Sequence, residues 1–158
     1  MAITNPITES QPIKPDFRYD SKAVAKFINY IMEGGRRDLA RKIVYSAFSQ
    51  IEDETDEDAL TVFEEAIEEV GPYMEVRSRR IGGANYQVPY EVDSKRRLQL
   101  TLRWLKGAAE SSQDSESFAQ VLAEEIMKAA DGEGSAVARK EQAHKMADAN
   151  KAFAHFAR

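Results

Sequence analysis

Apolar residues recur at helical spacing through the first fifty positions and predict two helices. In residues 21–35, SKAVAKFINYIMEGG, they lie three or four positions apart, as on one face of a helix. A cap at Asp20 or Ser21 and a glycine pair at 34–35 mark its ends. Residues 36–50, RRDLARKIVYSAFSQ, continue the pattern. The positions expected in the core are Val24, Phe27, Ile28 and Ile31, followed by Leu39, Ile43, Val44, Ala47 and Phe48.

A third amphipathic helix is predicted in residues 51–70, IEDETDEDALTVFEEAIEEV. Its cap is expected at Thr55 or Asp56, because carboxylates in a first turn are favoured by the helix dipole. The glycine and proline at 71–72 end it. The face expected in the core consists of Leu60, Phe63, Ile67 and Val70.

From residue 73 onward the period changes to two. Apolar and polar residues alternate on both sides of a glycine pair at 82–83, a pattern typical of two antiparallel strands joined by a tight turn. The sequence therefore predicts a β-hairpin over 73–92. Because a lone hairpin is only marginally stable, its apolar side is expected to rest on helices.

Helical spacing returns after the hairpin in three segments, DSKRRLQLTLRWLKGAA at 93–109, SESFAQVLAEEIMKAADGEG at 115–134 and SAVARKEQAHKMADANKAFAHFAR at 135–158. The expected fold class is mainly α, a single-domain bundle of about six helices with a hairpin protruding between the third and fourth. Residues 1–19 are expected to form an N-terminal tail, and residues 20–158 a single helical domain with the hairpin at 73–92. Trp104, in a leucine-rich segment, is expected to pack in the core or against the hairpin.

The composition narrows the possible functions. The chain has 158 residues, no cysteine and two histidines, which rules out disulfides and thiolate metal sites and leaves little for an imidazole site. No run approaches the roughly 18 apolar residues of a membrane span, and the start MAITNPITESQP does not resemble a secretory signal. We therefore expect a cytoplasmic protein with no cofactor, no metal and no membrane partner.

Charge is distributed very unevenly along the chain. The net charge is -5, but residues 51–70 hold ten acidic and no basic side chains, so the remaining residues sum to -5 minus -10, or +5. Residues 73–106 alone hold eight Lys or Arg against three Asp or Glu. A polarised molecule with a basic surface is expected, and such a surface attracts polyanions.

The hairpin sequence RSRRIGGANYQVP, at 77–89, places arginines next to a glycine turn and has two interpretations. Guanidinium groups can bind phosphate oxygens and stack on bases, which favours an RNA-binding ribbon. Alternatively, arginines on an edge strand guard against aggregation and the glycines only serve the turn. Further basic clusters at 36–42 and 96–106 favour the RNA interpretation.

Catalytic interpretations have little support in the sequence. The carboxylates of residues 64–69 are typical of a solvated helix face. His144 and His155 lie eleven positions apart, too far to share a metal from one helix. Neither GRR at 35–37 nor GEGS at 132–135 has the spacing of a phosphate-binding loop. We therefore do not expect an enzyme.

Several segments resemble one known family. RSRRIGGANYQVPYEV with RRLQLTLRWL is similar to the signature region of the small-subunit ribosomal protein seven family, in its bacterial-type form. FINYIMEGGRRDLARKIVY resembles its first two helices, and GEGSAVARKEQAHKMADANKAFAHF its final helix. The resemblance implies a structural constituent of the ribosome that binds the 3′ major (head) domain of small-subunit rRNA. It also implies help in starting head assembly, neighbouring head and platform proteins, and a position near the exit-site tRNA and the mRNA path.

The resemblance also implies which side chains face RNA. They come from the start of the second helix, the hairpin, the helix after it and the C-terminal helix. The residues expected at RNA are Arg36, Arg37, Arg77, Arg79, Arg80, Arg96, Arg97, Arg103, Lys140, His144, Lys145 and Lys151.

Two features depart from the family pattern. Its members usually have a basic N-terminal arm, whereas MAITNPITESQPIK contains only Lys14, and the acidity of residues 51–70 is unusual. The acidic helix is expected to face solvent or a neighbouring protein, because carboxylates near phosphates would be repelled. A rival hypothesis is a helical adaptor that binds a protein partner through the acidic helix or the hairpin edge.

Overall fold

The computed structural model describes residues 12–112 and 116–158 and is mainly helical, as predicted. Its elements, in chain order, are α1 (Lys22–Ile31), α2 (Arg37–Thr55), α3 (Ala59–Val70), β1 (Met74–Ile81), β2 (Ala84–Glu91), α4 (Ser94–Ser111), α5 (Phe118–Ala130), α6 (Gly134–Ala149) and the 3-10 helix η1 (Lys151–Ala157). The hairpin lies between the third and fourth helices, which confirms that prediction. The tail before residue 12 lies outside the described residues.

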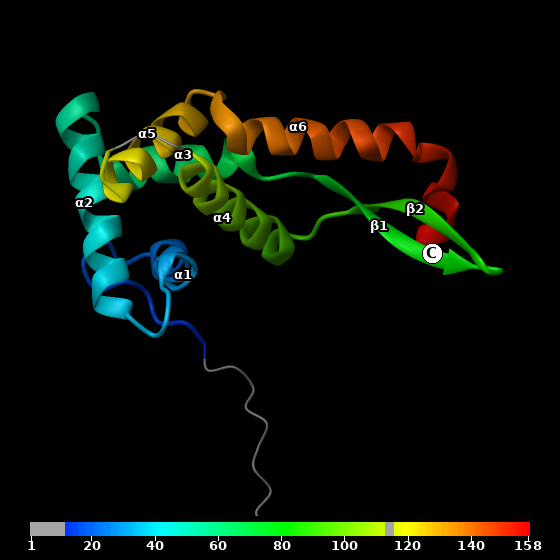
Figure 1. The fold of residues 1–158 in the computed structure, drawn as a ribbon, viewed down its shortest axis with the longest axis horizontal. Coiled ribbons are helices and arrows are strands. Elements are labelled where there is room, and N and C mark those ends of the chain that lie inside the picture. The colour runs from blue at the N-terminus through cyan, green and yellow to red at the C-terminus, as the bar shows by residue number, and fades with distance from the viewer. Residues whose placement is uncertain (1–11, 113–115) are drawn as a thin grey trace, which may run out of the picture.

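Helices α1 to α5 and the start of α6 enclose one apolar core (Figure 1). Ser21 caps α1, because its hydroxyl accepts a hydrogen bond from the amide of Val24. Three buried phenylalanines contact one another in this core, with Phe27 stacked on Phe63 and Phe48 tilted against it, each about 5 Å from the Phe63 ring. The hairpin extends from the helical body that surrounds this core.

One residue predicted for the core lies outside it. Leu39 is 51% exposed, so its assignment to the buried face of α2 was wrong. The buried residues of this helix are Ala40, Val44, Ala47, Phe48 and Ile51. These positions define a face that is rotated by about one residue from the stripe expected to contain Leu39.

The acidic segment is divided between two helices. α2 continues through Thr55, whose hydroxyl donates to the carbonyl of Ile51 and accepts from the amide of Glu57. Asp56 then adopts a left-handed conformation with φ of 55°, and α3 begins after Asp58. The expected cap at Thr55 or Asp56 was therefore wrong.

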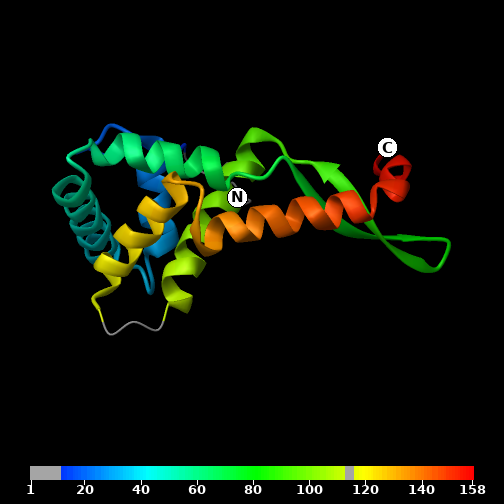
Figure 2. The same cartoon turned by 90° about the horizontal axis from the view of Figure 1, so that it is seen from above.

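The hairpin has a regular register closed by two glycines. Arg79 pairs with Tyr86 and Ile81 with Ala84, while Gly82 and Gly83 occupy the turn with φ of 57° and 85°. Positive φ at both turn residues matches the twist of the strands and favours glycine. Figures 1 and 2 show the ribbon extending from the helical body, with α6 running beside it.

The predicted final helix is interrupted near its end. α6 stops at Ala149, and the side-chain amide of Asn150 donates to the carbonyl of Met146 at 2.8 Å. The chain then turns into η1, which packs against β2. A local side-chain hydrogen bond of this kind competes with helix continuation, which explains why the last residues leave the helix axis.

Within residues 12–112 and 116–158, no helix combines the length and apolarity needed to cross a bilayer. In the same part of the chain, no three His, Asp or Glu side chains gather in a way that could hold a metal ion.

Candidate nucleic-acid interface

The three hairpin arginines point to two different faces. Side chains alternate along a strand, so Arg77 and Arg79 share one face of β1 and Arg80 lies on the other. Arg79 donates a hydrogen bond to the backbone carbonyl of Phe156 in η1. Arg80 is exposed, and its side chain makes no hydrogen bond or ion pair among the described residues. Arg80 therefore has the freest guanidinium group of the three.

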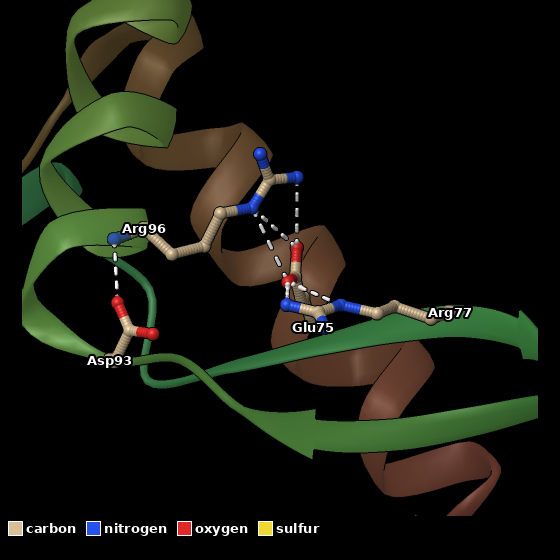
Figure 3. A network of polar contacts seen from close by, with 4 residues as sticks. All are labelled: Glu75, Arg77, Asp93 and Arg96. Carbon is tan, nitrogen blue, oxygen red and sulfur yellow. Dashed lines mark hydrogen bonds and ion pairs between the residues drawn. The ribbon is translucent and has the colours of Figure 1, made fainter. Parts of the chain in front are cut away.

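Glu75 gathers two of the predicted RNA-facing arginines at the base of the hairpin (Figure 3). Its carboxylate accepts from Arg77 at 2.5 and 2.9 Å and from Arg96 of α4 at 3.3 to 3.4 Å. Asp93 caps α4 beside this cluster by accepting from the backbone amide of Arg96 at 2.8 Å. One carboxylate thus joins β1 to the first turn of α4.

The protonation of Glu75 follows from these contacts. Its side chain is only 12% exposed, and burial alone would raise the pKa of the carboxyl. The hydrogen bonds and positive charges of Arg77 and Arg96 outweigh burial, so the pKa is lowered and the group stays ionised. At neutral pH, Arg77 and Arg96 therefore share one negative charge within the protein.

Arg97 turns away from the hairpin and lies against α3. Its guanidinium donates to the carbonyl oxygen of Glu68 at 3.0 Å and covers the ring of Tyr73 at 4.6 Å. The side chain is 20% exposed, and its Nε is buried without a hydrogen-bond partner. These contacts make Arg97 a bridge between α4 and the end of α3.

His144 also makes a contact within the protein. Its Nε2 accepts a hydrogen bond from the backbone amide of Tyr73 at 3.0 Å, and the two rings stack. Burial, followed by the positive charge of Lys140, lowers the pKa of the imidazole, which therefore stays neutral when it accepts this bond. Lys140 is half-buried, whereas Lys145 and Lys151 are exposed.

The remaining predicted residues do not join the hairpin. Arg36 and Arg37 lie at the start of α2, at the opposite end of the body from the hairpin tip (Figure 1). Arg103 is exposed on α4 beside a shallow groove of about 350 Å³ between α4 and α6. The structure thus brings the hairpin, the start of α4 and α6 together, and leaves the start of α2 apart.

Sequence reasoning missed a lysine group between α1 and α4. Lys22, Lys26 and Lys95 line a groove of about 490 Å³ together with Tyr30 and Gln99. None of the three lysines forms an ion pair within the described residues. The four-residue spacing of Lys22 and Lys26 places both on one helix face and is the sequence signal that could have found them.

An aromatic and cationic group on the segment before α1 was also missed. Phe17 is 78% exposed, and the guanidinium of Arg41 lies 5.1 Å from its ring centroid. Arg18 covers the ring of Tyr45 at 5.0 Å. Asp16 fixes this loop because its carboxylate accepts a hydrogen bond from the Tyr45 hydroxyl at 2.6 Å. The long-range bond between Asp16 and Tyr45 has no local pattern that sequence reasoning could use.

The largest acidic group is separated from the hairpin tip. The junction of α2 and α3 carries carboxylates from residues 52–58 and lies at the far end of the body from the turn of the hairpin (Figure 1). Four more carboxylates, those of Glu64, Glu65, Glu68 and Glu69, lie on α3, and Glu68 is paired with Arg97 near the hairpin base. Among the described residues, the ribbon tip thus carries cations and no carboxylate, while the α2–α3 turn carries carboxylates and no cation; Arg36 and Arg37 at the start of α2 lie apart from the ribbon.

Comparison with known proteins identifies the family. A family model described as ribosomal protein S7p/S5e matches residues 3–151. The small ribosomal subunit protein uS7 of Aromatoleum aromaticum is 50% identical over 144 residues, which cover 91% of this chain and 92% of that protein. The uS7 protein of Thermoanaerobacter pseudethanolicus is 51% identical over 148 residues, 94% of each chain. This chain therefore belongs to the ribosomal protein S7p/S5e family and is a structural ribosomal component rather than an enzyme.

Proposed function

We propose that the chain binds the 3′ major (head) domain of small-subunit rRNA and helps to start assembly of the subunit head. The interface consists of the hairpin, the start of α4, the groove between α1 and α4, and α6. The polarised charge carries this proposal. Among the described residues, Arg80, Arg103, Lys145 and the groove lysines are cations without carboxylate partners, while the acidic turn lies at the end of the body away from the hairpin tip.

The two kinds of arginine have different roles in this interface. Arg79 and Arg80 lie toward the tip of the hairpin, which is narrow enough to reach between RNA segments. Their guanidinium groups bind phosphate oxygens there. Arg77 and Arg96 share the charge of Glu75, so their binding to RNA releases fewer counterions. Their main role is to hold the base of the hairpin against α4. Proteins recognise folded, double-stranded RNA mainly by its shape, so the fixed form of the hairpin base contributes to selection of the RNA.

The partners of the chain follow from the same arrangement. The acidic turn faces solvent or a basic segment of a neighbouring head or platform protein, because phosphates would repel it. The ribbon lies near the exit-site tRNA and the mRNA path, and the protein acts in the cytoplasm as part of the ribosome.

Salt titration of RNA affinity tests the proposal. The logarithm of affinity for small-subunit rRNA falls linearly with the logarithm of salt, by roughly 0.7 to 0.9 per phosphate contact. Replacing both Arg79 and Arg80 by Ala should flatten the slope by about 1.5. Arg77→Ala should change the slope less, because its charge is already shared with Glu75.

Lys128→Ala serves as the matched control, because this lysine pairs with Glu125 on α5. It should leave the slope unchanged. An unchanged slope in the double variant, or binding that polyanion competitors do not affect, would contradict RNA binding by the ribbon and support a protein-binding adaptor.

A further inference from the structure

The C-terminal helix η1 folds back onto the hairpin and contacts both of its strands (Figures 1 and 2). From β2, the ring of Tyr86 packs against Phe153 and Phe156, with centroids 5.3 and 5.0 Å away. From β1, Arg79 donates to the backbone carbonyl of Phe156. Arg79 and Tyr86 are direct partners in the register and lie on one face of the ribbon, so η1 contacts both members of one cross-strand pair.

The outer half of the hairpin has little other support. Near the base, Val88 and Pro89 are buried and Glu75 joins β1 to α4. Beyond Arg77 on β1, the side chains are mostly exposed, and a two-stranded ribbon is only marginally stable by itself. Helix α6 also contacts both strands, and Gln87 donates to the hydroxyl of Ser78 across them, but the aromatic packing on the outer half comes from η1.

We propose that η1 is a brace that fixes the direction of the outer hairpin, with Phe156 and Tyr86 as positioning residues. Held in one orientation, Arg79 and Arg80 meet RNA without the cost of ordering a mobile ribbon. This role rests on the proposed RNA binding, but the brace itself is a property of the free protein. Phe156 carries no charge, so it acts on RNA affinity through the position of the arginines.

Amide hydrogen exchange of the free protein tests the brace. Phe156→Ala removes the ring that packs on Tyr86, and the amides of residues 79–86 should exchange about tenfold faster. Amides of residues 74–77 and 88–91 should keep their rates, because the base is held by other contacts. Phe156→Tyr retains the ring and should restore protection. Unchanged exchange at residues 79–86 in Phe156→Ala would overturn the brace.

RNA affinity tests the positioning role. Phe156→Ala should lower affinity about three- to tenfold at every salt concentration, leaving the slope against salt unchanged, because no charge is removed. Lys151→Ala, on the same helix, should show the opposite behaviour, with a flatter slope and unchanged exchange. Faster exchange in Phe156→Ala without any loss of affinity would overturn the positioning role.

The two proposals fail in different ways. If the unaltered chain bound rRNA without salt dependence, the proposed function would be wrong. The exchange rates of Phe156→Ala would then still support or overturn the brace, since they need no RNA.

Discussion

Replacing Glu75 by Gln should weaken the contact that joins the base of the hairpin to α4. The substitution keeps the size of the side chain but removes the negative charge that Arg77 and Arg96 share. Breaking a fully buried ion pair costs about 3 to 5 kcal/mol. Arg77 and Arg96 are 53% and 33% exposed, so water recovers part of this energy.

We expect Glu75→Gln to lower the free energy of unfolding by about 2 kcal/mol. At about 2 to 4 °C per kcal/mol for a chain of this size, the melting temperature should fall by about 4 to 8 °C. Urea unfolding at neutral pH measures the effect. Glu91→Gln is the matched control, since Glu91 is exposed on the partner strand and forms no ion pair among the described residues.

The effect should also depend on pH. Because the pKa of Glu75 is lowered in the folded protein, its stabilisation is complete above the ordinary value of 4.5 and disappears as the pH falls through the folded pKa. The difference between the variant and the unaltered chain should therefore shrink in acid. If Glu75→Gln proved as stable as Glu91→Gln at neutral pH, the reasoning about the joint would be refuted.

Two further predictions concern the base of the hairpin. The pKa of His144 is lowered in the folded protein, so the free energy of unfolding should decrease as the pH drops below about 6.5. In His144→Gln, the free energy of unfolding measured in urea should depend less on pH below this value. A steep fall that persists in the variant would contradict the neutral acceptor role toward Tyr73. Gly71→Ala would place a Cβ 2.5 Å from Nε of Arg97 and should cost about 1 to 2 kcal/mol by thermal unfolding. Gly107→Ala, where the added Cβ would meet no atom within 4 Å, should instead raise the free energy of unfolding by about 0.5 to 1 kcal/mol. If Gly71→Ala and Gly107→Ala changed stability equally, the steric argument would be refuted.

The regular elements could be predicted from the sequence because each follows a local rule. The spacing of apolar residues gave α1 its buried face, and the change to a period of two with the glycine turn at 82–83 identified the hairpin. The break at Asp56 could not be read in the same way, since a non-glycine residue there adopts the left-handed conformation. Leu39 was misplaced because its helix turns another face to the core.

The interface was predicted in part, because sequence shows where charges lie and does not show what they pair with. Arg96 and Arg97 are neighbours in a basic run, yet one shares Glu75 and the other lies against α3. His144 accepts a backbone hydrogen bond from a residue 71 positions away. Such pairings depend on the packing of distant elements, which residue spacing along one helix does not report.

We propose that the ribbon side of the molecule meets RNA and that the acidic turn does not. Hydrogen exchange of the chain, with and without a head-domain rRNA fragment, tests this claim most directly. We predict slower exchange in the hairpin at 79–86 and at the start of α4 in 95–99, with unchanged exchange at 52–58. Protection of residues 52–58 together with an unaffected hairpin would contradict the account.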